Sequence, residues 1–252
     1  MSLAPTQLAQ ETPRAAHAPA SWEQARAALG PVRGSERGGR APIKRLVVAG
    51  VRRTCDVLVA GVLLVVLAPL LAVLALAIRL DSPGPALFRQ RRVGRGQREF
   101  TLCKFRTMDA DADAARHREY VQTLIGDARA SERGHLYKLS VDDRVTRVGR
   151  RLRAWSLDEL PQLFNVLRGE MALVGPRPVI PYEVACYPDA YLARFAVKPG
   201  LTGLWQVSGR NERTYDEMVR FDVEYAAADS LLLDLRILVR TVPVVLGRRG
   251  VA

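Results

Sequence analysis

The 252-residue chain is poor in the side chains on which much enzyme chemistry depends. Its three cysteines stand at positions 55, 103 and 186, and no two of them have Cys-x-x-Cys spacing. An odd number of scattered cysteines argues against a disulfide framework and a zinc site, and it indicates a reduced, cytosol-facing location. The histidines are also scattered, at positions 17, 117 and 135. If the chain is an enzyme, we expect its chemistry to use carboxylates and a metal rather than imidazole.

Positive charge and apolar side chains are abundant instead. The formal net charge is +12, and 48% of the residues are hydrophobic, which is enough for one substantial core or two small ones. A basic chain suits nucleic acid, an anionic membrane surface or phosphorylated substrates. The charge alone does not choose among these three kinds of partner.

Residues 1–43 are rich in Ala, Pro, Gly and Arg and contain few large apolar side chains. Such a composition buries too little apolar surface to offset the conformational entropy lost on folding, so we expect a disordered tail. The tail also lacks the short apolar stretch of a secretory signal. The folded part of the protein is therefore expected to begin near residue 44.

An uncharged run of 22 residues, 57–78, follows the tail. At about 1.5 Å per residue, a helix of this length is long enough to cross a bilayer. A buried helix of a soluble protein is the alternative, but such a helix normally has one polar face, which this run lacks. We therefore predict that residues 44–80 form a membrane-associated helix.

Whether this helix spans the membrane depends on Pro69 and on the charged flanks. Pro69 lies in the middle of the run, where a proline removes one backbone hydrogen bond and kinks or breaks the helix. Six basic residues lie on each side of the run, so the positive-inside rule gives no direction. We predict that both flanks stay in the cytoplasm and that a re-entrant helical hairpin, broken at Pro69, dips into one leaflet.

The remainder, residues 81–252, is predicted to form one cytosolic α+β domain that is mainly α-helical. Two extended runs around a Gly-containing tetrapeptide, 86–93 and 98–108, predict a β-hairpin. The other expected elements are an exposed helix over 109–128, an amphipathic basic helix over 142–155, loops over 170–211, and helices over 212–228 and 230–246. The basic helix suits contact with anionic lipid head groups, so we expect a monotopic membrane protein with interfacial amphipathic helices.

Two adjacent carboxylates, Asp158 and Glu159, follow a run of arginines. Carboxylates among basic side chains suit a metal ion or a phosphorylated ligand. The pattern Ser156-x-x-Glu159 before an apolar run is also that of a helix capping box, in which both side chains bind backbone N–H groups. Pro161 fits only the first turn of such a helix. Taken alone, the two carboxylates favour the cap over catalysis.

Four blocks of sequence resemble the bacterial sugar transferases, a family of monotopic phosphoglycosyl transferases. The blocks occur in family order between about residues 44 and 250, and they span 104–108, 156–169, 173–178 and 198–211. The resemblance implies transfer of hexose 1-phosphate from a UDP-sugar to a polyprenyl phosphate such as undecaprenyl phosphate, with release of UMP. The stretch 233–238 resembles the short branch that starts exopolysaccharides on galactose or glucose. The implied location is the cytoplasmic face of the bacterial inner membrane.

The resemblance also implies roles for individual residues, and with the four blocks in place catalysis is favoured over the cap. Asp158 matches the nucleophile that forms a covalent phosphosugar intermediate, and Glu159 matches a residue that helps to hold Mg²⁺. A carboxylate can divide one transfer between two bulky anions into two displacements. Arg147 and Arg150 are assigned to lipid head groups or to the polyprenyl phosphate. The full set expected to bind substrate is Lys104, Arg106, Arg147, Arg150, Arg177, Pro199, Gly200 and Arg210.

For several of these basic residues, a purely structural role is the alternative to substrate binding. Arg177, between two prolines, is suited to binding a phosphate with two hydrogen bonds, but it also fits a solvent-facing turn. Lys104 and Arg106 either line the same pocket or merely flank a strand. Arg210 either contacts the nucleotide or sugar or merely closes a Gly-rich loop.

Two other classes of function stay open at this stage. A membrane-tethered nucleic-acid-binding or scaffolding protein would use the basic face without catalysis and would bind DNA in a salt-dependent way. A retaining or inverting glycosyltransferase would use the same donor but release UDP. The favoured interpretation has a UDP-sugar, polyprenyl phosphate and membrane lipids as partners, excludes nucleic acid, and leaves a homodimer open.

Overall fold

The computed structural model describes residues 42–109, 144–209, 214–228 and 230–247. Nearly all of the expected tail and of the helix expected over 109–128 lies outside these ranges, as does Arg210. The helices (α), 3-10 helices (η) and strands (β) are α2 (Pro42–Asp81), β1 (Leu87–Val93), η1 (Arg95–Gln97), β2 (Glu99–Phe105), α5 (Arg147–Ala154), η2 (Leu157–Gln162), α6 (Leu163–Arg168), β3 (Ala172–Val174), α7 (Pro181–Val184), η3 (Asp189–Ala196), β4 (Gly200–Thr202), η4 (Trp205–Val207), α8 (Tyr215–Ala228) and α9 (Leu231–Leu246).

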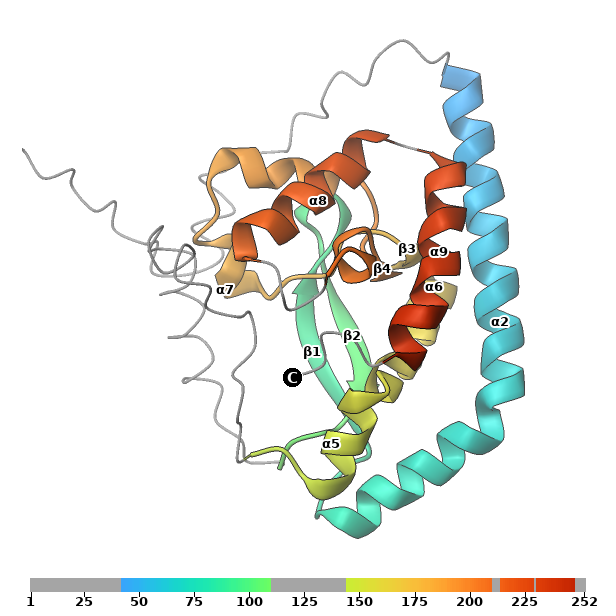
Figure 1. Ribbon diagram of the computed structural model, residues 1–252, viewed down its shortest axis with the longest axis vertical. Helices are drawn as coiled ribbons and strands as arrows, with labels where there is room; N and C mark the ends of the chain where they lie inside the picture. The colour runs from blue at the N-terminus through green and yellow to red at the C-terminus, as the bar shows by residue number, and fades with distance from the viewer. Residues whose placement is uncertain (1–41, 110–143, 210–213, 229, 248–252) are drawn as a thin grey trace, which may run out of the picture.

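Most of the described chain is helical, and its strands form two small two-stranded sheets (Figure 1). This confirms the predicted mainly helical α+β fold with one long apolar helix. The β1–β2 hairpin lies at the centre of Figure 1, with α8 above it and α5 below it. The long helix α2 runs along one side, next to α9, to which it is joined by an ion pair described below.

α2 is a single helix of 40 residues that contains Pro69. Figure 1 shows that α2 bends in its C-terminal half, the half that contains Pro69, and then runs toward α5. A proline inside a helix removes one backbone hydrogen bond and clashes with the preceding turn, which accounts for a bend. The helix is bent but continuous, so its halves do not fold back on each other as a tight hairpin. It also begins two residues earlier than predicted, at Pro42.

α2 is largely exposed although it is apolar. By length and composition, residues Leu46–Asp81 could cross a membrane, and only 6% of the most apolar 18-residue window is buried. A core helix of a soluble protein would be mostly buried, so this segment is not one. A continuous apolar surface of this kind is unfavourable in water, which favours contact with lipid.

Charged side chains fasten the N-terminal half of α2 to the rest of the protein. Arg53 donates hydrogen bonds of 2.5 and 2.7 Å to two carbonyl oxygens at the C-terminal end of α6. Asp56 accepts a hydrogen bond of 3.0 Å from the backbone N–H of Leu173 in β3. Arg52 forms an ion pair of 2.6 Å with Asp234 of α9. These contacts hold the part of α2 that precedes the uncharged run against the rest of the protein.

The C-terminal end of α2 is fastened as well. Arg106, which follows β2, is buried and donates to the backbone carbonyl oxygens of Ser82, at 2.7 Å, and Pro83. Asp81 accepts a hydrogen bond of 2.9 Å from the N–H of Val148 in α5. An apolar cluster joins the same elements, and its buried members are Ile78, Phe105 and Leu152. Both ends of the uncharged run are therefore bound to one folded domain.

β1 and β2 form the predicted hairpin as an antiparallel pair. Asn165, fully buried on α6, accepts a hydrogen bond of 3.0 Å from the N–H of Cys103. The Asn165 amide also donates to the carbonyl oxygen of Thr101 at 2.7 Å. These two bonds hold β2 against α6, and η2 is the element that immediately precedes α6. The predicted helices over 212–228 and 230–246 are confirmed as α8 and α9.

β3 and β4 form a parallel two-stranded sheet in the region where the sequence predicts only loops. Glycines allow their backbones to approach closely: a Cβ atom on Gly200 would stand 2.0 Å from the backbone nitrogen of Gly175. The carbonyl oxygen of Pro199 accepts a hydrogen bond of 2.8 Å from the N–H of Ala172. Pro199 therefore accepts a backbone hydrogen bond that supports this sheet, and Gly200 allows its backbone to lie close to Gly175.

The variant Gly200→Ala should destabilise the protein by at least about 3 kcal/mol, because its Cβ would meet backbone atoms that cannot move aside. For a chain of this size the melting temperature in detergent, followed by tryptophan fluorescence, should fall by about 6 °C or more. Gly50→Ala is the control, because nothing lies within 4 Å of a Cβ atom there. A Gly200→Ala protein with an unchanged melting temperature would contradict the structural role.

Candidate active site

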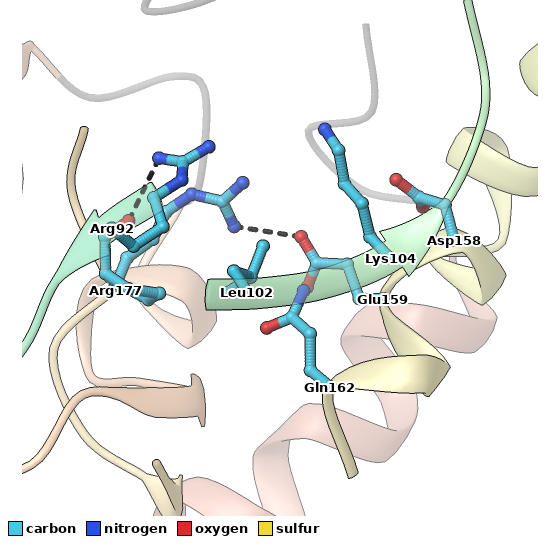
Figure 2. A pocket seen from close by; sticks show the side chains of 8 residues that line it. Arg92, Leu102, Lys104, Asp158, Glu159, Gln162 and Arg177 are labelled. Carbon is cyan, nitrogen blue, oxygen red and sulfur yellow. Dashed lines mark hydrogen bonds and ion pairs between the residues drawn. The ribbon is translucent and has the colours of Figure 1, made fainter. Parts of the chain in front are cut away.

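Asp158 and Glu159 line a small pocket together with basic side chains (Figure 2). The other residues that line it are Arg92, Leu102, Lys104, Gln162, Arg177 and Pro178. They come from β1, β2, η2 and the segment after β3. Two carboxylates and three cations from distant parts of the sequence thus share one pocket.

The two carboxylates are carried by the 3-10 helix η2, not by the first turn of an α-helix. Ser156, immediately before η2, has a left-handed backbone with φ of 55°, and its side chain makes no capping hydrogen bond. Pro161 lies inside η2, where the α-helical hydrogen-bond ladder has not yet begun. The capping-box interpretation is therefore wrong, and the Glu159 side chain lines the pocket.

Glu159 forms an ion pair with Arg177 across this pocket. The Arg177 Nη1 atom donates to the Glu159 Oε1 atom at 2.9 Å, as the dashed line in Figure 2 marks. The two side chains are 28% and 21% exposed, so solvent and small ligands can still reach the pair. A guanidinium carries five N–H donors, which lets Arg177 bind an anionic ligand in addition to Glu159 or in its place.

The segment 176–179, which carries Arg177, is fixed through its carbonyl groups. Two of its four residues are prolines, which have no N–H to donate. Each of the four carbonyl oxygens accepts a hydrogen bond of 2.8 to 3.1 Å from another element. The backbone N–H groups of Gly200 and Val93 donate to the first and the last carbonyl. The side chains of Arg194 and Arg92 donate to the carbonyls of Arg177 and Pro178. The Arg177 side chain therefore extends from a backbone that is held in place.

Lys104 reaches the pocket from β2. Its ammonium nitrogen lies 5.2 Å from the centre of the Phe88 ring. Burial lowers the pKa of Lys104 to about 8, the charge of Arg92 acts in the same direction, and the charge of Asp158 opposes the shift. Lys104 is therefore mostly charged at pH 7 and loses its charge as the pH rises through about 8.

Four of the residues expected from the sequence meet in this pocket: Asp158, Glu159, Lys104 and Arg177. Arg106 does not join them, although it lies two residues from Lys104. Its guanidinium is buried and binds the backbone carbonyl oxygens of Ser82 and Pro83, which immediately follow α2. Arg106 thus has a structural role at this turn, and its expected role in substrate binding stays a prediction.

The remaining expected residues lie away from the pocket or outside the described chain. Gly200 lies in β4 and Pro199 immediately precedes it; neither lines the pocket, so their expected role in substrate binding stays a prediction. Arg147 and Arg150 are exposed on α5, next to the C-terminal end of α2. Arg210 lies outside the residues that the structure describes.

Arg92 and Gln162 line the pocket but were not identified from the sequence. Arg92 lies opposite Phe100 in the hairpin, and side chains at alternate positions share one face of a strand. Phe100, Leu102 and Lys104 therefore face the same way as Arg92. Applying this alternation to the predicted hairpin would have placed Arg92 on the same face as Lys104, whereas Gln162 has no comparable signal.

The pocket fits Mg²⁺ only together with a phosphorylated ligand. Within the described ranges, no group of three or more His, Cys, Asp or Glu side chains could hold a metal ion by itself. Mg²⁺ typically takes one or two carboxylates and completes its shell with water and substrate phosphates. Asp158 and Glu159 supply two such carboxylates, and the surrounding cations suit the phosphates.

Comparison with known proteins places these features in context. A family model described as bacterial sugar transferase matches residues 47–248. The UDP-glucose:undecaprenyl-phosphate glucose-1-phosphate transferase of Caulobacter vibrioides is 46% identical over 211 residues, which cover 80% of this chain and 72% of that protein. The exopolysaccharide production protein ExoY of Rhizobium meliloti is 41% identical over 199 residues, which cover 79% of this chain and 87% of that protein.

A longer relative matches over the same part of the chain. The undecaprenyl-phosphate galactose phosphotransferase of Salmonella typhimurium is 43% identical over 202 residues, which cover 79% of this chain but 41% of that protein. The similarity is thus confined to one part of the longer protein.

The affinity of the pocket for an anion should fall between pH 7 and pH 9, because Lys104 loses its charge with a pKa of about 8. Isothermal titration with inorganic pyrophosphate should give a dissociation constant that rises by up to about tenfold over this range. Lys104→Arg stays charged and serves as the control, since the ionisation of pyrophosphate itself affects both proteins equally. Equal pH dependence in the two proteins would exclude Lys104 from the anion site.

Proposed function

The chain belongs to the bacterial sugar transferase family, and from this premise we propose that it transfers hexose 1-phosphate from a UDP-sugar to undecaprenyl phosphate and releases UMP. Two relatives are named as a UDP-glucose:undecaprenyl-phosphate glucose-1-phosphate transferase and an undecaprenyl-phosphate galactose phosphotransferase, so galactose and glucose are the sugars proposed. The product would be the first membrane-bound intermediate of an exopolysaccharide or another glycan.

The observation that carries this proposal is the pocket in which two adjacent carboxylates face three cations. Asp158 and Glu159 share it with Arg92, Lys104 and Arg177. The diphosphate of a UDP-sugar is a dianion, whose charge the cations can neutralise while the carboxylates remain ionised. A nucleic-acid-binding or scaffolding protein has no need of adjacent carboxylates among its cations.

The reaction proposed at Asp158 has two displacements. In the first, a carboxylate oxygen of Asp158 forms a bond to the β-phosphorus of the UDP-sugar. The bond from that phosphorus to the bridging oxygen breaks, and UMP leaves with the electron pair. In the second, an oxygen of undecaprenyl phosphate attacks the same phosphorus, and the Asp158 carboxylate leaves unchanged. Each displacement exchanges one phosphorus–oxygen bond for another, so no further reactant is needed.

The neighbouring residues would position the diphosphate for this attack. Glu159, with Asp158 beside it, would hold Mg²⁺ against the diphosphate of the donor. The ion, when bound, supplies positive charge that offsets the charge of the phosphates. Arg177 can pass from Glu159 to a phosphate oxygen, because its backbone is held in place and its side chain is partly exposed. Lys104 and Arg92 complete the cationic side of the pocket.

The membrane arrangement proposed for α2 is re-entrant, with both ends at the cytoplasmic face of the inner membrane. Arg53 and Asp56, before the uncharged run, bind α6 and β3. Asp81, after the run, binds α5 of the same folded domain. One domain cannot lie on both sides of a bilayer, so these contacts support a helix that enters and leaves by one face. Arg147 and Arg150 would then face lipid head groups.

The released nucleotide tests the reaction. Detergent-solubilised protein with Mg²⁺, undecaprenyl phosphate and a UDP-hexose should release UMP, and UDP as the product would refute phosphate transfer. Without the lipid, wild type should form a covalent phosphosugar adduct that mass spectrometry assigns to Asp158. Asp158→Asn should form no adduct and lose at least about 10³-fold in turnover, because an amide is not a nucleophile of this kind. Full activity in that variant would disprove the nucleophile assignment.

Cysteine labelling tests the arrangement of α2. We suggest Val47→Cys and Leu80→Cys, introduced singly where Cys55 and Cys186 are replaced by serine, because both positions are exposed. A membrane-impermeant maleimide should label both in inside-out vesicles and neither in intact spheroplasts. Labelling of Val47→Cys from the outer face alone would show that α2 spans the membrane.

A further inference from the structure

A buried polar network binds the backbone of Arg177. Arg194 of η3 donates to the carbonyl oxygen of Arg177 at 2.8 Å, and it pairs with the carboxylate of Asp222 on α8. The other guanidinium nitrogen of Arg194 donates to the hydroxyl of Tyr187 at 2.8 Å. That hydroxyl lies 2.5 Å from the hydroxyl of Tyr215, which in turn bonds Glu183 at 3.1 Å.

Asp222 is the one member of this network with an unused acceptor. Its side chain is 2% exposed, and its Oδ2 atom binds Arg194. Its Oδ1 atom is buried and has no hydrogen-bond partner among the residues that the structure describes. Asp222 and Arg177 line the same small cavity, together with Glu183, Arg194 and Trp205 among others. Arg177 also lines the pocket of Asp158 and Glu159, so it lies between the two.

An unused, fully buried carboxylate oxygen is costly for stability alone. Buried ion pairs contribute little net stability, because desolvation offsets their attraction, and an unbonded polar atom adds to that cost. Burial raises the pKa of Asp222 to about 6, while the charges of Arg194 and Arg177 limit the rise. The charge of Asp222 therefore acts on Arg177 as well as on Arg194, and its position calls for a functional explanation.

We propose that Asp222 is a positioning residue for Arg177. It orients Arg194, which holds the Arg177 carbonyl group, and its second carboxylate oxygen offers the Arg177 guanidinium an anionic neighbour when Glu159 is occupied by a ligand. Arg177 would thus stay in register with the donor phosphates after it leaves Glu159. This inference rests on the proposed function and deepens it, because it adds a residue that does not line the pocket of Asp158 and Glu159.

A double-mutant cycle with Arg177→Ala tests the inference. The measurement is the single-turnover rate of adduct formation and UMP release, with melting temperatures recorded for every variant. Asp222→Asn keeps the size of the side chain and removes its charge, so it should slow the wild-type reaction by about 10- to 100-fold. In the Arg177→Ala background it should slow the reaction less than twofold, because Asp222 acts through the absent guanidinium.

A merely structural role predicts a different pattern. Asp222→Asn would then lower the melting temperature and slow the reaction by the same factor in both backgrounds, and that result would overturn the inference. Asp216→Asn is the matched control, because Asp216 lies on the same helix in an exposed ion pair with Arg220. It should leave the rate and the cycle unchanged.

A second variant keeps the test decisive if Asp222→Asn does not fold. Tyr187→Phe removes one hydrogen bond to Arg194 and leaves its ion pair with Asp222. We expect it to slow adduct formation by about threefold in the wild-type background and to have no effect with Arg177→Ala. Equal effects in both backgrounds would contradict the inference. If wild type releases no UMP at all, the proposed function fails first, so the two failures are distinguishable.

Discussion

Two carboxylates on consecutive residues disfavour each other's ionisation in a half-buried pocket unless cations stand close by. The rest of the site depends on meeting this constraint at Asp158 and Glu159. The cations come from three separate elements: Arg92 from β1, Lys104 from β2 and Arg177 from the segment after β3. The β1–β2 hairpin supplies two of them on one face, and the β3–β4 sheet directs the third toward Glu159. Both small sheets therefore serve the same electrostatic requirement.

The third cation illustrates how rigidity is obtained without a regular element. The segment 176–179 contains two prolines, which fix part of the backbone but cannot donate hydrogen bonds. Its four carbonyl oxygens are bound instead by β1, η3 and β4. One of these donors, Arg194, is anchored by Asp222 on α8, so the C-terminal part of the chain contributes to the site without lining the pocket of the two carboxylates. A preorganised cation needs no reorganisation when charge develops on a phosphate, which is where electrostatic catalysis gains most.

The sequence predicted those features that follow from local pattern. The hairpin, α8 and α9 have the expected alternation or helical spacing, and the uncharged run predicted a membrane-associated helix. The β3–β4 sheet was missed for two reasons. Each strand has three residues, too few for alternation to appear, and the two strands lie far apart along the chain. The capping role of Ser156 was wrong for a related reason: local pattern does not reveal that Ser156 adopts a left-handed backbone. Nor does local pattern reveal that Arg106 binds the backbone just after α2.

The position of the site follows from how α2 meets the domain. Arg52, Arg53 and Asp56 are all paired with the domain. Because ionised groups are costly within hydrocarbon, the proposed arrangement puts this part of α2 at head-group level. In the proposed arrangement the uncharged run would enter lipid, and Asp81 would connect the chain back to α5 through its hydrogen bond with Val148. Only two residues separate α5 from η2, which carries Asp158 and Glu159. If α5 lies along the membrane surface, Asp158 and Glu159 also lie near the head groups, because they follow α5 closely in the chain. An acceptor phosphate anchored by its lipid chain could then reach Asp158 without leaving the bilayer, while the nucleotide donor arrives from the aqueous side.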